Sequence, residues 1–203
     1  YSNISNYLNP KFYFNLTHLI SNYIENKNYK KAKKLLKNFN KEDEIYYWYK
    51  LKKIAQIIDD EENSKKSLLY IEKKFNEYSN PSIKIIYDMA NIYKRSKEFE
   101  KSIKYYSLLL NKLNENSDEY ADILYRRGSS YERLKDYKSS DKDLLKSLSI
   151  KPNEPYVLNY LGYGWLERGY KIQDAIGMLD KAYNQKKNDP FIIDSVGWGY
   201  YLI

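Results

Sequence analysis

The sequence predicts an all-α protein, a right-handed superhelical solenoid of antiparallel helix pairs. The first observation is a pattern that returns about every 34 to 38 residues: a small residue, an aromatic residue three positions later, a second aromatic residue and a second small residue. The second is that apolar residues recur at i, i+3, i+4 and i+7, the spacing of an amphipathic helix. The third is the scarcity of Pro and Gly, 5 and 7 of 203 residues, which suits helices joined by short turns.

The pattern predicts a single array of repeats over residues 13–203. Its repeats are expected to begin near Tyr13, Trp48, Ile83, Ala121, Pro155 and Pro190, and the last one is partial. In four of them the small and aromatic positions are filled by Ile20, Tyr23, Tyr29 and Ala32; Ala90, Tyr93, Phe99 and Ser102; Gly128, Tyr131, Tyr137 and Ser140; and Gly162, Trp165 and Ala175. Such an array grows by adding hairpins and needs no single closed core.

The first elements are the least regular. Residues 1–12 are rich in Asn and Ser, and Asn9-Pro10 stands where an earlier repeat would end. This segment is therefore predicted to be a leader or the tail of a preceding repeat. The first repeat follows near Tyr13. The second repeat is the most degenerate, because polar Ser64 replaces its second aromatic residue.

The third repeat shows the helix spacing clearly, with Ile86, Met89, Ala90 and Tyr93 along its first helix. Extra polar residues at 114–118 make this repeat longer than the others. Prolines mark the turns before later repeats, because Pro disfavours helix in the residue before it and is accepted in the first turn of a new helix. These prolines are Pro81, Pro152, Pro155 and Pro190.

In the fourth to sixth repeats the small position of the first helix is Gly128, Gly162 and Gly197. A glycine inside a helix costs about 1 kcal/mol relative to Ala. We therefore expect a neighbouring helix to approach closely at each of the three. Asp136 and Asp174 are expected at the starts of second helices, where Asp accepts hydrogen bonds from free backbone N–H groups.

Residues 121–152 resemble the tetratricopeptide repeat, a helical hairpin of about 34 residues. The match rests on Gly128, Tyr131, Tyr137 and Pro152. Residues 155–187 are also similar to this family but contain one inserted residue after Gly169, so the turn of that hairpin is expected to differ. The resemblance covers about residues 13–203 and is strongest from residue 83 onward.

A narrower resemblance concerns the strings LYRRGSSYERL (124–134), YVLNYLGYGWLERG (156–169) and DPFIIDSVGWGYYL (189–202). They look like multi-repeat bacterial proteins of the same family, some of which are exported or are envelope lipoproteins. This likeness implies a location in the bacterial periplasm or cell envelope, with the cytoplasm as the alternative.

The family resemblance also implies a function. Its members bind proteins or peptides along a concave groove lined by the first helices, so a non-catalytic scaffold or adaptor is predicted, with a protein or extended peptide as partner. The groove positions of the family correspond here to Tyr49, Lys52, Lys84, Tyr87, Asn91, Lys94, Arg95, Tyr125, Arg133, Tyr156, Asn159, Tyr163 and Trp198. Trp198 is a candidate ligand anchor, because Trp often dominates interface energetics. Trp165 is expected in the core instead.

Two alternatives stay open. A net charge of +8 and 25 tyrosines are compatible with a helical repeat that binds nucleic acid. However, lysine supplies all but five of the 35 basic residues, as in proteins encoded by AT-rich genes, and acidic runs at 42–44 and 59–62 follow the basic run at 27–37. The second alternative is a self-associating structural module, which would pair through an exposed surface at residues 191–203.

No catalytic, metal-binding or cofactor-binding residues are predicted. The chain has no Cys, which excludes disulfides and thiolate metal sites. His18 is its single histidine and has no nucleophile at a suggestive spacing. Gly162 and Gly164 do not form a dinucleotide loop, because no strand precedes them. No apolar run approaches the length of about 18 residues that a transmembrane helix needs.

Overall fold

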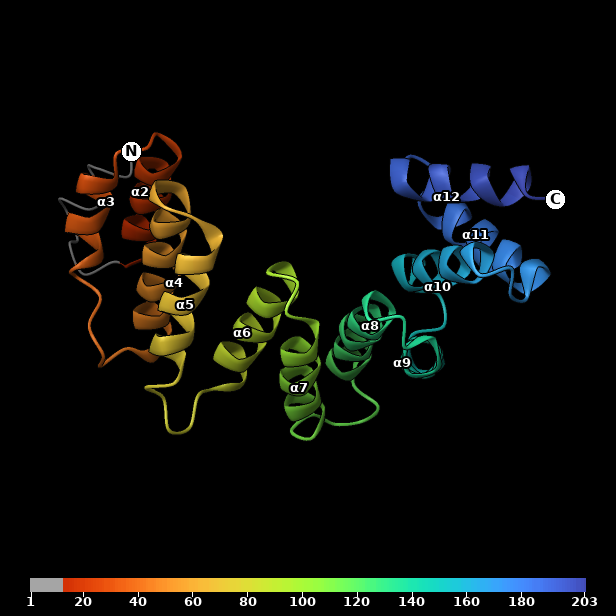
Figure 1. Ribbon diagram of the computed structural model, residues 1–203, viewed down its shortest axis with the longest axis horizontal. Coiled ribbons are helices and arrows are strands. Elements are labelled where there is room, and N and C mark those ends of the chain that lie inside the picture. Colours follow the sequence, from red (N-terminus) through yellow and green to blue (C-terminus); the bar gives the residue numbers. More distant parts are fainter. Residues whose placement is uncertain (1–12) are drawn as a thin grey trace. The chain divides into compact units, whose positions relative to one another are not determined.

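The computed structural model describes residues 13–203, so the predicted leader at 1–12 lies outside the described residues. Every regular element within 13–203 is an α-helix (Figure 1). The helices are α2 (Tyr13–Glu25), α3 (Tyr29–Leu36), α4 (Glu44–Glu61), α5 (Ser64–Phe75), α6 (Ile83–Arg95), α7 (Phe99–Leu110), α8 (Asp118–Arg133), α9 (Tyr137–Ile150), α10 (Pro155–Glu167), α11 (Ile172–Gln185) and α12 (Pro190–Tyr201). The predicted all-α fold is confirmed.

Consecutive helices pack against each other as hairpins. α2 packs on α3, α4 on α5, α8 on α9 and α10 on α11, and α12 lies against both α10 and α11. The two helices of each hairpin are joined by only a few residues, which makes them antiparallel neighbours. The chain forms two compact units, one that ends at Ile85 and one that comprises Ile86–Ile203.

The first unit has a hydrophobic core of its own. Phe39 is fully buried at its centre among leucines and isoleucines of α2, α3 and α4. The rings of Tyr13, Tyr46 and Tyr49 pack around Phe39 with centroid separations of 5.0, 5.5 and 5.7 Å. Aromatic pairs at such distances stabilise a core beyond the area they bury.

Two first helices begin earlier than the sequence pattern predicts. α4 begins at Glu44, ahead of Trp48, because Asp43 accepts a hydrogen bond from the backbone N–H of Tyr46 at 3.1 Å. α8 begins at Asp118, ahead of Ala121, because the Ser117 hydroxyl accepts one from the N–H of Tyr120 at 3.1 Å. These side chains satisfy N–H groups that the first turn of a helix leaves free.

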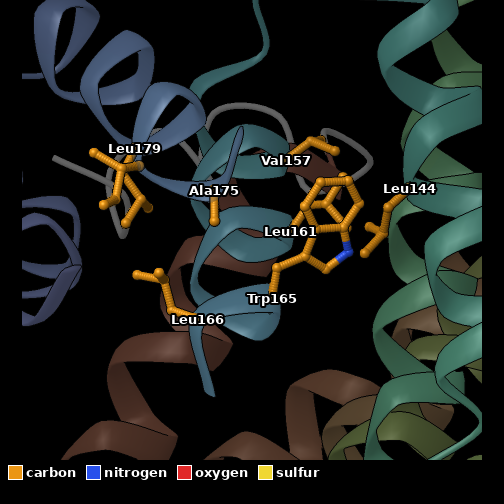
Figure 2. Packing of buried hydrophobic residues seen from close by; sticks show 8 residues of the cluster. Leu144, Val157, Leu161, Trp165, Leu166, Ala175 and Leu179 are labelled. Carbon is orange, nitrogen blue, oxygen red and sulfur yellow. The ribbon is translucent and has the colours of Figure 1, made fainter. Parts of the chain in front are cut away.

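The second unit is built around the core shown in Figure 2. Leu144 of α9, Leu161 and Trp165 of α10, and Leu179 of α11 meet there. Trp165 is 3% exposed, so its predicted place in the core is confirmed. Burying a leucine-sized side chain contributes about 1.5–3 kcal/mol relative to leaving it in water.

The glycine prediction holds at two of three positions. A Cβ on Gly128 would lie 3.1 Å from Leu144, and a Cβ on Gly162 would lie 2.9 Å from the carbonyl oxygen of Ala175. The prediction is wrong for Gly197, around which no described atom lies within 4 Å of such a Cβ. Gly199 makes the close approach in α12 instead, 3.0 Å from Leu166.

Four of the five hairpin turns in residues 13–203 share one geometry, and the α4–α5 turn differs, with φ of −128° at Glu62. Lys27, Lys97, Lys135 and Gly169 all have positive φ, between 55° and 62°. In each turn the following N–H donates back to a carbonyl near the end of the first helix, as Tyr170 does to Trp165 at 2.9 Å. The fifth hairpin differs as expected, because Lys171 adds a second residue with positive φ, 45°.

This extra residue moves the start of the next helix. α11 begins at Ile172, so Asp174 lies within its first turn and the prediction that it precedes the helix is wrong. Asp136 does cap α9, accepting a hydrogen bond from the N–H of Ser139 at 3.1 Å. None of the helices in residues 13–203 combines the length and the hydropathy that crossing a membrane requires.

Candidate functional site

The candidate site lies on the first helices of the second unit, α6, α8, α10 and α12. At its α6 end, Asn91 is the centre of a polar network. Its Oδ1 accepts hydrogen bonds from the Tyr106 hydroxyl at 2.8 Å and from Nη1 of Arg126 at 3.3 Å. The Arg126 guanidinium lies 5.2 Å from the ring centroid of Tyr87, in cation–π contact. Tyr87 and Asn91, two predicted groove residues, and Arg126 therefore hold one another in place.

Lys94 lies one helical turn after Asn91. Its Nζ donates to the hydroxyl of Ser129 on α8, and that hydroxyl donates to the carbonyl oxygen of Arg126 at 2.8 Å. Burial lowers the pKa of Lys94 to about 8, and the positive charges of Arg126 and Arg133 contribute to the decrease. We call Lys94, Arg126 and Arg133 the cation cluster.

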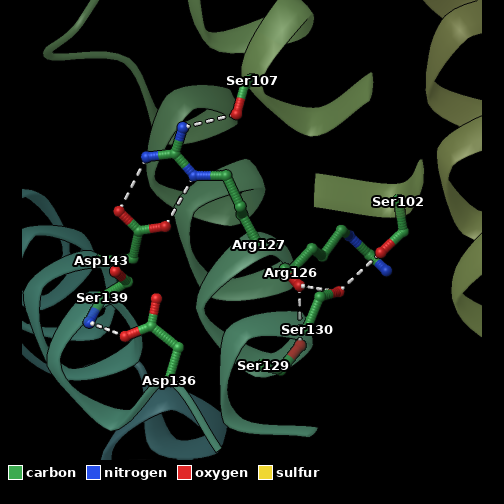
Figure 3. Close-up of polar contacts among 9 residues, drawn as sticks. All are labelled: Ser102, Ser107, Arg126, Arg127, Ser129, Ser130, Asp136, Ser139 and Asp143. Atoms are coloured by element: carbon green, nitrogen blue, oxygen red, sulfur yellow. Dashed lines mark hydrogen bonds and ion pairs between the residues drawn. The ribbon is translucent and has the colours of Figure 1, made fainter. Parts of the chain in front are cut away.

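Arg127, the neighbour of Arg126 on α8, has a different role. It donates to both carboxylate oxygens of Asp143 on α9, at 2.7 and 2.8 Å, and to the Ser107 hydroxyl on α7 at 2.9 Å (Figure 3). Figure 3 also shows the Arg126 side chain leaving α8 in a different direction from this ion pair. Arg127 thus ties three helices together and is a packing residue.

A second arginine is held in the same way from the opposite side of α9. Arg168, the C-cap residue of α10, donates to the two carboxylate oxygens of Asp141, at 3.2 and 2.8 Å. Its guanidinium also lies 4.7 Å from the ring centroid of Tyr137. A bidentate pair of this kind fixes both side chains.

Tyr160 connects the cation cluster to the next part of the site. Its hydroxyl donates to Oε2 of Glu132 at 3.0 Å and approaches the carbonyl oxygen of Ser129 at 3.4 Å. Burial, reinforced by the negative charge of Glu132, raises the pKa of the Tyr160 phenol. Tyr125 packs edge-to-face on Tyr160, with ring centroids 5.8 Å apart.

Beyond Tyr160 lies a cavity of about 280 Å³. Its lining residues are Glu132, Arg133, Asn159, Tyr160, Tyr163, Gly164, Phe191, Asp194 and Ser195. Oδ1 of Asn159 is buried and has no hydrogen-bond partner among residues 13–203. Such an atom costs free energy unless a ligand or water supplies a donor.

A more open hollow of about 640 Å³ adjoins this cavity and shares Tyr163 and Asp194 with it. The rings of Trp198 and Tyr201 stack there at 5.5 Å and 22°. Trp198 is 38% exposed and Phe191 is 77% exposed. We call the cavity and the hollow together the aromatic pocket.

The other predicted groove residues lie apart from these two features. Tyr49 and Lys52 are on α4 in the first unit, where the Tyr49 hydroxyl donates to the carbonyl oxygen of Thr17 at 3.0 Å. Tyr156 donates to Asp189 at 3.2 Å and therefore ties α10 to the turn before α12. Lys84 and Arg95 lie near the two ends of α6 and are exposed.

The prediction from family positions omitted Arg126 and Tyr201. Arg126 follows Tyr125, a predicted groove position, and only its contacts with Tyr87 and Asn91 place it in the site. Tyr201 could have been found from spacing, because it lies three residues after Trp198 on the same helix face. No group of three or more His, Asp or Glu side chains in residues 13–203 is arranged to hold a metal ion.

A family model described as the tetratricopeptide repeat matches residues 83–111, which include α6 and α7, and residues 121–154, which include most of α8 and all of α9. These two segments are tetratricopeptide repeats. The helices α6 and α8, which carry one end of the candidate site, are the first helices of these two repeats. No curated protein matches the sequence.

Several solved structures share this fold. BtubC from P. vanneervenii is similar with a TM-score of 0.66 and 17% identity over 92% of this chain and 84% of that one. A tetratricopeptide repeat protein from Parabacteroides merdae gives 0.65 and 17%, over 94% and 73%. A MamA double mutant gives 0.62 and 12%, over 85% and 93%. Identities this low relate the folds alone.

Proposed function

We propose that this tetratricopeptide repeat protein is a non-catalytic scaffold or adaptor that binds an extended peptide segment of a partner protein in the aromatic pocket. The observation that carries the proposal is the gathering of exposed Tyr163, Phe191 and Trp198 in the aromatic pocket, whose cavity contains the unpartnered amide oxygen of Asn159. Tyr and Trp are enriched in protein interfaces, and buried hot spots are rich in them.

The size and polarity of the pocket support a peptide ligand. The cavity of about 280 Å³ is near the lower limit for small-molecule sites, roughly 300 Å³, so it suits one anchoring side chain better than a whole cofactor. The Asn159 oxygen is an acceptor for a peptide N–H. The exposed rings beside it would lose their contact with water when a partner covers them, which favours binding.

A peptide-display experiment with the full chain tests the proposal. Peptides selected on the wild type should bind Trp198→Ala about thirtyfold more weakly, because removing a hot-spot Trp costs about 2 kcal/mol. Tyr183→Ala is the matched control, since Tyr183 is an exposed aromatic residue on α11 that does not line the pocket. Equal affinities for wild type and Trp198→Ala would contradict the proposal.

Nucleic-acid binding and self-association stay predictions from the sequence, as does a location in the bacterial periplasm or cell envelope. The peptide proposal is favoured over nucleic acid because Glu132, Glu167 and Asp194 line the pocket and would repel a phosphate backbone. It does not depend on the compartment.

A further inference from the structure

Lys94 lies in an unusual electrostatic environment. Its side chain is half-buried, and its ammonium donates only to the neutral hydroxyl of Ser129. Arg126 and Arg133 add two further positive charges nearby. Within residues 13–203 none of these three cations forms an ion pair with a carboxylate. Removing an ion from water costs free energy unless a counter-charge is close, so the ammonium form of this lysine is disfavoured.

Arg126 has an unused hydrogen-bond donor. Its Nη1 donates to a neutral amide oxygen, that of Asn91, at 3.3 Å, and its Nε is buried without a hydrogen-bond partner in the described part of the chain. Arg127 and Arg168 differ, because each donates twice to an aspartate. The surroundings of Lys94 thus offer positive charge and a free N–H donor but no anion.

The neutral amine of a lysine is a nucleophile, and both burial and neighbouring cations favour that neutral form. Both act on Lys94 and lower its pKa to about 8, so about half of the side chain is free amine at that pH. The side chain is only half-buried, which leaves Nζ within reach of a small neutral electrophile from solvent.

We propose that Lys94 is a modification site at which carbon dioxide adds to the side-chain amine and the Arg126 guanidinium holds the carboxylate that forms. Nζ of the free amine attacks the carbon of carbon dioxide. A C–N bond forms, one pair of C=O electrons moves to an oxygen, and a proton leaves the nitrogen for water. The product is a lysine carbamate, with one negative charge where the ammonium had one positive charge, and no other reactant is needed.

The carbamate supplies what the surroundings lack. Its carboxylate accepts hydrogen bonds from a guanidinium, and such charge-assisted bonds are about twice as strong as neutral ones. Its nitrogen keeps one N–H, which is enough to preserve the bond from Lys94 to the Ser129 hydroxyl. Acetylation of the same amine would remove a positive charge but would provide no anion. Carbon dioxide therefore suits this lysine better than an acyl donor does.

The modification changes the charge at one edge of the aromatic pocket, which Arg133 lines. The cation cluster would change from three positive charges to two positive charges and one negative charge. The concentration of dissolved carbon dioxide would thereby set the local electrostatic potential. Carbamate formation needs no bound peptide, so it does not depend on the proposed function.

Chemical trapping on the full chain tests the proposal. The protein is equilibrated at about pH 8 with isotopically labelled bicarbonate, the source of carbon dioxide, and triethyloxonium then converts any carbamate into a stable ethyl ester for mass spectrometry. The labelled ester should appear on Lys94. Lys53 is the internal control, because it is also half-buried and burial also lowers its pKa. It donates to Gln56 at 3.1 Å, and residues 13–85, which include it, contain no arginine.

Three variants show whether the guanidinium matters. Lys94→Arg should lose the label at this position, because a guanidinium stays protonated. Arg126→Gln should lower labelling of Lys94 about tenfold, since hydrogen bonds to charged groups are the strong ones. Arg95→Gln, which changes an exposed arginine adjacent to Lys94, should leave the labelling unchanged. Thermal melts establish that each variant is folded.

Three results would overturn the proposal. The first is wild type without label on Lys94. The second is labelling of Lys94 no greater than that of Lys53, which would show that a half-buried amine is sufficient without a neighbouring guanidinium. The third is equal labelling of Lys94 in wild type and in folded Arg126→Gln.

Discussion

At the level of single residues, the second unit uses its arginines in two ways. Arg127 and Arg168 form bidentate ion pairs inside the helix stack. Arg126 bonds to the Asn91 amide and Arg133 lines the aromatic pocket, and neither forms an ion pair within residues 13–203. Arg126 and Arg127 are adjacent in the sequence, so composition and spacing alone do not distinguish them. Their roles differ because consecutive helical residues point in different directions.

This difference predicts opposite results for two neighbouring substitutions. Arg127→Met should lower the free energy of unfolding by about 3 kcal/mol, because Asp143, 4% exposed, would keep a buried charge without a partner. Arg126→Met is the matched control and should cost less than about 1 kcal/mol, since it breaks no ion pair. Urea denaturation of both variants measures the difference. Equal losses would show that the Arg127 ion pair does not stabilise the fold.

Lys94 makes the stability of the fold depend on pH. Burial lowers its pKa from 10.5 to about 8, so in the folded protein the ammonium is present below about pH 8 and is lost as the pH rises further. Of the other groups that face Lys94, Arg126 and Arg133 stay charged throughout, and Ser129 does not titrate.

The free energy of unfolding should therefore rise above about pH 8, by up to about 1.4 kcal/mol per pH unit, because the unfolded chain keeps a proton on Lys94 that the folded chain has lost. Lys94→Met should abolish this increase, because it removes the titrating group. Urea denaturation of both proteins at about pH 7, 8 and 9 measures the difference. The same pH dependence in wild type and Lys94→Met would rule out Lys94 as its cause.

At the level of helices, the glycines at the small position of the repeat show which close helix contacts the sequence pattern predicts and which it does not. Gly128 and Gly162 were predicted from spacing, and both receive the second helix of their own hairpin. Gly197 occupies the same position of the pattern but meets no described neighbour, while Gly199 packs against Leu166. The pattern predicts which face of a helix carries small residues. Whether another helix packs closely against that face depends on the tertiary structure.

Alanine at these two kinds of glycine should have opposite effects. Gly162→Ala should destabilise the protein by about 1–3 kcal/mol, because its Cβ would lie 2.9 Å from the backbone oxygen of Ala175. Gly197→Ala should stabilise α12 by up to about 1 kcal/mol, since Ala is the better helix former and the space is open. Thermal melts of the pair provide the measurement. Stabilisation by Gly162→Ala would contradict the close packing.

At the level of the whole molecule, the all-α repeat fold could be predicted because it depends on local periodicity. The family positions predicted four of the residues that line the aromatic pocket, namely Arg133, Asn159, Tyr163 and Trp198. The cation cluster was not predicted as a unit. Its key contact joins Lys94 to Ser129, 35 residues along the chain, and depends on where long side chains end after the repeats stack. Family positions identify residues that face a groove, but they do not show which of them keep an unpaired charge.

The two aspartates of α9 hold their own hairpin together and link it to the next repeat. Asp143 is held by Arg127 of α8, the other helix of the same hairpin, and Asp141 is held by Arg168 at the C-cap of α10. Loss of either arginine contact would leave an aspartate of α9 without its counter-charge. Solenoids lose order through weak interfaces between helices of neighbouring repeats. Here ion pairs connect α9 to the helix before it and to the helix after it. The backbone amides of α8, α9 and α10 should therefore exchange with solvent as one cooperative block, so that fraying from the chain end stops at α10.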